Sequence, residues 1–200
     1  MEYQNIIIGI FIAGLPLLLI ELVSRKYKIN PEISRKTVHI VGSMSAIFLI
    51  NVCNFNEIAL IAGLFTIGMI VFRKYQVFRS LYRIKRRSWG EVAFTLGVML
   101  TAILAQLDKV YIVTILILGL SDTIANLIGS KWGRLKILNT RKTYIGSISF
   151  ALTTSLILFL ASFTTETVII VSLLATATEA FSTNGSDNIT IPLVVVLSLR

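Results

Sequence analysis

Long apolar segments alternate with short polar connections along almost the whole chain. The apolar segments lie at about 5–23, 37–52, 57–72, 92–107, 110–130, 145–163 and 167–181, and a shorter run at 191–199 closes the chain. A helix needs about 20 apolar residues to cross the ~30 Å hydrocarbon core of a bilayer. The pattern therefore predicts an all-α fold, a polytopic transmembrane helix bundle of about seven spans plus a short C-terminal apolar segment.

Composition excludes a soluble domain. Of the 200 residues, 55% are hydrophobic and 14% are charged, against roughly 45–50% and 25% in a typical soluble protein. The spans use nearly all of this length, so we expect residues 1–200 to form a single integral membrane domain. The first residues carry no basic region, and we expect the first apolar segment to be retained as a helix, not cleaved as a signal peptide.

Positive charge is confined to alternate connections. All Lys and Arg residues except Lys109 and Arg200 lie between the first and second, the third and fourth, or the fifth and sixth apolar segments. Basic residues in short loops stay on the cytoplasmic side of a membrane, so we predict an outside N-terminus and cytoplasmic basic loops. This topology explains the net charge of +9. It argues against nucleic acid as a partner and leaves anionic membrane lipids as neighbours of the loops.

One carboxylate lies within an apolar segment. Asp122 precedes Lys131 by roughly 13 Å of helix, and a carboxylate at that depth is costly unless it serves a wet cavity or a partner. Asn126, Gly129 and Gly133 follow on the same helix face. For the glycines, close approach of a ligand to the backbone and simple helix packing are equally good interpretations.

The remaining polar groups fall on the cytoplasmic side of the predicted bundle. Arg141 and Lys142 precede a helix start, where backbone N–H groups and cationic side chains can hold phosphate. Glu179 and Asp187 supply carboxylates that suit magnesium, which commonly binds one or two carboxylates together with substrate phosphates. His39 opens the second apolar segment, and both a role in the site and a role as an interfacial hydrogen-bonding group are open.

Polar and glycine residues form four ordered motifs between residues 35 and 192. They are Arg35-Lys36 with His39; Asp122, Ala125, Gly129 and Gly133 in a D-x-x-A-x-x-x-G-x-x-x-G segment; Lys142-Thr143 with Gly146-Ser147; and Glu179 followed by Asp187-Asn188 and Pro192. The set resembles the motifs of the CTP-dependent lipid-alcohol kinases, which include dolichol kinase, phytol kinase and the yeast-type diacylglycerol kinase. These enzymes are related to phosphatidate cytidylyltransferase. Four motifs in order are much more specific than any one of them.

The resemblance implies a membrane lipid kinase. Such an enzyme transfers the γ-phosphoryl group of CTP to the hydroxyl of a polyprenol, a phytol-like isoprenoid alcohol or diacylglycerol at the cytoplasmic face. The resemblance implies catalytic roles for Asp122, Lys142, Glu179 and Asp187, with magnesium held by Asp122, Glu179 and Asp187. The nucleotide- and phosphate-binding residues that it implies are Arg35, Lys36, His39, Asn126, Gly129, Arg141, Thr143, Gly146, Ser147 and Asn188.

Alternatives remain at the level of sequence. Ile145 stands where the K-T-x-E-G-S loop of the family has glutamate, which is compatible either with lost activity or with a site in which the other carboxylates suffice. A phosphatidate cytidylyltransferase-like enzyme is the nearest alternative, and a non-catalytic lipid-binding or transport protein is the alternative from another class. Transport sites typically lie near the midplane between inverted repeats, and we find no such repeat. The lipid, the choice of CTP and the oligomeric state stay open.

Overall fold

The computed structural model describes residues 3–75, 77, 89–138 and 140–200, and within these ranges the regular structure is helical. The first half contains α1 (Tyr3–Lys26), α2 (Pro31–Phe48), the 3₁₀ turn η1 (Leu49–Asn51), α3 (Phe55–Lys74) and α5 (Gly90–Leu104). The second half contains α6 (Asp108–Leu116), the π-helical turn η2 (Ile117–Ser121), α7 (Asp122–Trp132), α8 (Tyr144–Leu160), α9 (Thr165–Phe181) and α10 (Asp187–Ser198).

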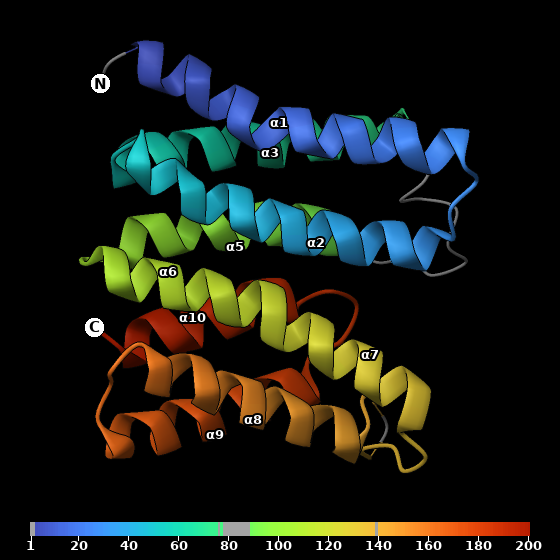
Figure 1. Cartoon of the computed structure of the whole chain (residues 1–200), viewed down its shortest axis with the longest axis vertical. Helices are drawn as coiled ribbons and strands as arrows, with labels where there is room; N and C mark the ends of the chain where they lie inside the picture. Colours follow the sequence, from blue (N-terminus) through green and yellow to red (C-terminus); the bar gives the residue numbers. More distant parts are fainter. Residues whose placement is uncertain (1–2, 76, 78–88, 139) are drawn as a thin grey trace.

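Successive helices run back and forth beside one another, and α6, η2 and α7 continue as one long element (Figure 1). Both chain termini lie at one end of the bundle (Figure 1). The connections 27–30 and 133–143 lie at the opposite end, which we call the polar end (Figure 1). Two of the three basic connections therefore lie at the same end of the bundle, as the alternation of basic loops predicts. The third falls largely outside the described residues.

The structure confirms a helical membrane protein but not the predicted number of spans. Among the described residues, four helices are long and apolar enough to cross a membrane, namely Tyr3–Lys26, Pro31–Asn51, Phe55–Lys74 and Asp108–Trp132. Gly90–Leu104, Tyr144–Leu160 and Asp187–Ser198 are apolar but shorter. The short C-terminal run is part of a true helix, because α10 begins at Asp187 and includes polar residues that hydropathy alone assigned to a loop.

Helix α2 begins before the apolar segment that predicted it. Asn30 caps its N-terminus by accepting a hydrogen bond from the Glu32 N–H at 2.9 Å, and Pro31 occupies the first turn. An Asn-Pro pair of this kind is a common helix start, because proline lacks the N–H that the first turn leaves unpaired. Arg35 and Lys36 therefore lie on the helix with His39, one turn apart, instead of in a preceding loop.

Two main apolar clusters hold the helices together. One contains buried residues of α2, α3, α5 and α6, with Tyr111 and Ile58 at its centre. The other joins α8, α9 and α10 to the long central helix around Phe150 and Val195. Helix α1 stays at the edge with large apolar side chains exposed, including Phe11, as expected for a surface that faces lipid.

Candidate active site

The centre of the polar end is a single lysine among three carboxylates. The Lys142 Nζ lies 2.7 Å from Glu179 Oε1, 3.0 Å from Asp187 Oδ2 and 3.4 Å from Asp122 Oδ1. The carboxylates come from the end of α9, the start of α10 and the start of α7, and the lysine comes from the α7–α8 connection. All four predicted catalytic residues are thus brought together from distant parts of the chain.

A short backbone hairpin holds Lys142 in place. The Ile137 N–H donates to the Lys142 carbonyl at 3.0 Å, and the Tyr144 N–H donates to the Leu135 carbonyl at 3.2 Å. The Lys142 N–H in turn donates to the Thr140 hydroxyl at 3.2 Å. Because both backbone groups of Lys142 are bonded, its side chain leaves the hairpin in a defined direction, toward the carboxylates.

Electrostatics keep this lysine charged. Burial alone would lower the pKa of Lys142, but the nearby carboxylates of Asp122, Asp187 and Glu179 outweigh burial and raise the pKa above its usual value. Glu179 is only 2% exposed, and its second oxygen accepts a hydrogen bond from the Ser147 hydroxyl at 2.8 Å. Each Glu179 oxygen therefore has a protein partner, and Ser147 acts behind the site by orienting that carboxylate.

The π-helical turn η2 sets the position of Asp122. A π turn interrupts the regular i to i−4 hydrogen bonding of a helix and is often found at functional sites. The Leu118 carbonyl in this turn accepts a hydrogen bond from His39 Nε2 at 2.9 Å, and the same nitrogen lies 4.0 Å from Asp122 Oδ2. Asn126 donates its side-chain N–H to the Asp122 carbonyl at 2.8 Å. His39 thus joins α2 to the helix that carries Asp122.

Close packing of α7 on α8 accounts for the small residues of this chain's second and third motifs. A methyl group added at Gly129 would meet the Thr143 hydroxyl at 2.7 Å, and one added at Gly146 would meet the Ala125 carbonyl at 3.0 Å. Thr143 caps α8 by accepting a hydrogen bond from the Gly146 N–H at 3.2 Å. The glycines therefore serve helix packing, and Gly129 and Gly146 also line the cavity described below.

We expect Gly133→Ala to destabilise the protein, whereas Gly68→Ala leaves stability unchanged or higher. The added methyl group at Gly133 would collide with the Gly129 carbonyl and the Thr143 hydroxyl. Overpacking of this kind costs about 1–3 kcal/mol. At Gly68 the nearest atom is 3.8 Å away, on Phe72. Thermal unfolding in detergent measures both, and equal midpoints for the two variants would contradict the packing role.

A cavity of about 430 Å³ opens at the polar end beside Lys142. Among the predicted site residues, only Ser147 does not line it. Arg35, Lys36 and Arg141 place three cationic side chains on its walls, although Lys36 is paired with Glu32 at 3.6 Å. The lining residues that the sequence did not single out are Glu32, Thr123, Ser130, Thr140, Ser182, Thr183, Asn184 and Gly185.

The segment 182–185 is the main part of the site that sequence reasoning missed. It joins α9 to α10, and its residues lie between Glu179 and Asp187. Two carboxylates so close along the chain, on a connection at the polar end, were the available signal. Ile145, in contrast, is 40% exposed on the first turn of α8 and does not line the cavity. The cavity wall of this chain therefore does not include the position at which the family motif has glutamate.

The carboxylates are chemically suited to magnesium only in part. Within the described ranges, no group of three His, Cys, Asp or Glu side chains is arranged around a common metal position. The central position is instead taken by the Lys142 ammonium. Asp122 and Asp187 remain at the cavity wall, and two carboxylates together with phosphate oxygens are a usual magnesium environment.

Fold and site together define a helical membrane protein with a densely charged cavity at one end of its bundle. The chain is 27% identical over 194 residues to a protein described as a phytol kinase from Synechocystis sp., and the alignment covers 90% of this chain and 83% of that relative. The chain is a homologue of this kinase, which confirms the resemblance to the lipid-alcohol kinases and supports a lipid kinase function. No family model and no solved structure matches the chain.

Proposed function

We propose that this protein transfers the γ-phosphoryl group of CTP to the hydroxyl of a membrane-embedded isoprenoid alcohol. The observation that carries the proposal is the cavity itself, where a lysine held by three carboxylates adjoins further cationic side chains. Phosphoryl transfer requires mainly positioning and stabilisation of charge. A charged cavity at the end of an apolar bundle meets both requirements for a donor from water and an acceptor from lipid.

Each charged group has a definite task in this proposal. Arg35, Arg141 and Lys142 bind the phosphates and stabilise the charge that spreads over the transferred group. Asp122 accepts the proton of the alcohol hydroxyl while the alcohol oxygen bonds to the γ-phosphorus. The bond between the γ-phosphorus and the oxygen that bridges it to the β-phosphate breaks at the same time. The products are a lipid phosphate and CDP. Glu179, buried behind Lys142, keeps the ammonium in position.

Magnesium is the proposed cofactor. Asp187 and one oxygen of Asp122 would hold it together with phosphate oxygens, which leaves the second Asp122 oxygen as the proton acceptor. Glu179, whose two oxygens are bonded to Lys142 and Ser147, would enter its coordination only after Lys142 moved. The ion would supply positive charge at the transferred phosphate.

We further propose that the polar end faces the cytoplasm, with the N-terminus outside, because the basic connections favour this orientation. The shorter helices would also cross the membrane, which makes about seven spans.

A transfer assay with purified protein tests the function. The protein is incubated with magnesium, with γ-labelled CTP or, in parallel, γ-labelled ATP, and with phytol, polyprenols or diacylglycerol as acceptor. The proposal predicts labelled lipid and release of CDP. A second assay uses the phosphates of the same lipids with α-labelled CTP. It tests for cytidylyl transfer, in which pyrophosphate is released and the label enters the lipid. Labelling by that route alone would replace the kinase proposal, and no transfer by folded protein would refute it.

A further inference from the structure

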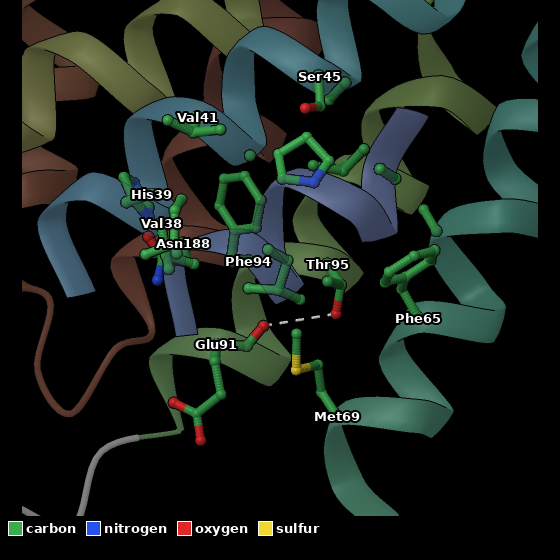
Figure 2. Close-up of a pocket in the computed structure, with 18 of the residues that line it drawn as sticks. Val38, His39, Val41, Ser45, Phe65, Met69, Glu91, Phe94, Thr95 and Asn188 are labelled. Atoms are coloured by element: carbon green, nitrogen blue, oxygen red, sulfur yellow. Dashed lines mark hydrogen bonds between the residues drawn. The ribbon is translucent and has the colours of Figure 1, made fainter. Parts of the chain in front are cut away.

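A second, apolar cavity lies between α1, α2, α3 and α5. Its volume is about 110 Å³, and its walls are mostly aliphatic and aromatic. Figure 2 shows Phe65, Met69 and Phe94 directed into this space, with Val38 and Val41 of α2 beside them. Helix α1 closes the outer side with Pro16 and Leu17. Because α1 is the least buried of the long helices, this wall separates the cavity from surrounding lipid by a single helix.

The apolar cavity is continuous in its lining with the charged cavity. Arg35, His39 and Asn188 line both, and Figure 2 shows His39 and Asn188 together at one side of the apolar space. The His39 ring also packs on Phe94, with ring centroids 4.8 Å apart. These three residues form a junction at which a molecule lying in the apolar cavity would meet the phosphate-binding groups.

Two buried polar atoms at this junction have no partner. They are Arg35 Nε, a donor, and Asn188 Oδ1, an acceptor. Asn188 is 6% exposed, and its amide nitrogen already donates to the Gly90 carbonyl at 2.8 Å, which leaves the oxygen unpaired. An unpaired buried polar group costs about 1–3 kcal/mol. A hydroxyl group both accepts and donates a hydrogen bond, so it offers the kind of partner that each of these atoms lacks.

We propose that the apolar cavity binds the hydroxyl-bearing end of the hydrocarbon chain of the acceptor alcohol, with its terminal hydroxyl held at Arg35 Nε and Asn188 Oδ1 until the hydroxyl proton turns to Asp122 for transfer. This inference rests on the proposed kinase function. It commits to one occupant, a primary alcohol on a single hydrocarbon chain. Diacylglycerol would place its ester carbonyls against these walls. The Thr95 hydroxyl there already donates to the Val92 carbonyl at 3.0 Å and accepts from the Thr66 hydroxyl at 2.9 Å, so its proton is not available to an ester carbonyl.

A matched pair of substitutions on α1 tests the cavity. Leu17 lines it, whereas Leu18 is 50% exposed on the outer side and does not. Leu17→Trp fills the space, and we expect kcat/KM for phytol to fall at least tenfold, which corresponds to about 1.4 kcal/mol. The KM for the nucleotide should not change, and Leu18→Trp should behave as the unsubstituted protein does. Equal activity of both variants on phytol would overturn the proposal, as would equal activity of the unsubstituted protein on phytol and dioleoylglycerol.

A labelling experiment keeps the inference independent of variant folding and of turnover. A phytol analogue with a photoreactive diazirine in its chain is irradiated with the unsubstituted protein in lipid nanodiscs, and the labelled peptides are sequenced. Labelling of 13–20, 35–49, 61–69 or 90–98, the segments that line the cavity, supports the site if excess phytol prevents it. Labelling confined to other segments overturns the proposal. If no alcohol is phosphorylated but these segments are labelled, the kinase proposal fails while the alcohol site stands.

Discussion

Replacing Lys142 with methionine is expected to abolish phosphoryl transfer and to lower the free energy of unfolding by about 3 kcal/mol. The substitution leaves the Glu179, Asp187 and Asp122 carboxylates close together without the ammonium that holds them. Removing one partner of a buried ion pair typically costs about 3–5 kcal/mol, because the remaining charge is uncompensated. Transfer from labelled nucleotide and thermal unfolding in detergent measure the two effects separately.

Two further variants separate the structural role of Lys142 from its chemical role. Lys136→Met alters an exposed lysine of the same hairpin that does not line the cavity, and it should retain activity and stability. Lys142→Met combined with Glu179→Gln removes the most buried of the three negative charges as well, so part of the lost stability should return while activity stays lost. Recovery of transfer in the double variant would show that Lys142 is only a structural counter-ion.

Asp122→Asn should reduce kcat by about a thousandfold, within the 10²–10⁴ range of general acid–base catalysis, while the fold is kept. The amide has nearly the same shape as the carboxylate, and two carboxylates remain beside Lys142. We expect nucleotide binding to weaken much less than kcat falls. Steady-state transfer rates and equilibrium binding of unhydrolysable nucleotide provide the measurements.

Asp108→Asn is the matched control for Asp122. Asp108 begins the same continuous helix, at the far end from the cavity, and its side chain is exposed. We expect its activity to stay close to that of the unsubstituted protein, because a surface substitution away from the site usually changes stability by less than about 0.5 kcal/mol. An Asp122→Asn enzyme with more than a tenth of normal kcat would exclude Asp122 as the proton acceptor.

Local signals predicted the helices and the residues of the site. Apolar runs indicate helices because backbone groups in lipid must be bonded within the segment, and each predicted run coincides with a helix of the structure. The start of α2 was also readable, from the Asn30-Pro31 pair, although hydropathy alone placed it too late. The carboxylate within the long central helix marked Asp122, because an ionisable group at that position needs a cavity or a partner.

The functions of individual residues depend on distances that no local pattern contains. Sequence left two interpretations open for Gly129, and only the contact of α7 with Thr143 and Gly146 shows that packing requires it. The turn η2, which presents the Leu118 carbonyl to His39, likewise depends on how α2 packs against the central helix.

The sequence by itself determined a helical membrane protein, the common end of its polar motifs and the family that they resemble. Hydropathy and motif order are properties of neighbouring residues, so they can be read without a fold. Only the tertiary structure decided that Lys142 lies among Asp122, Glu179 and Asp187 and that Arg35 and Asn188 join the charged cavity to an apolar one. These residues are far apart along the chain, and their proximity arises from the packing of whole helices.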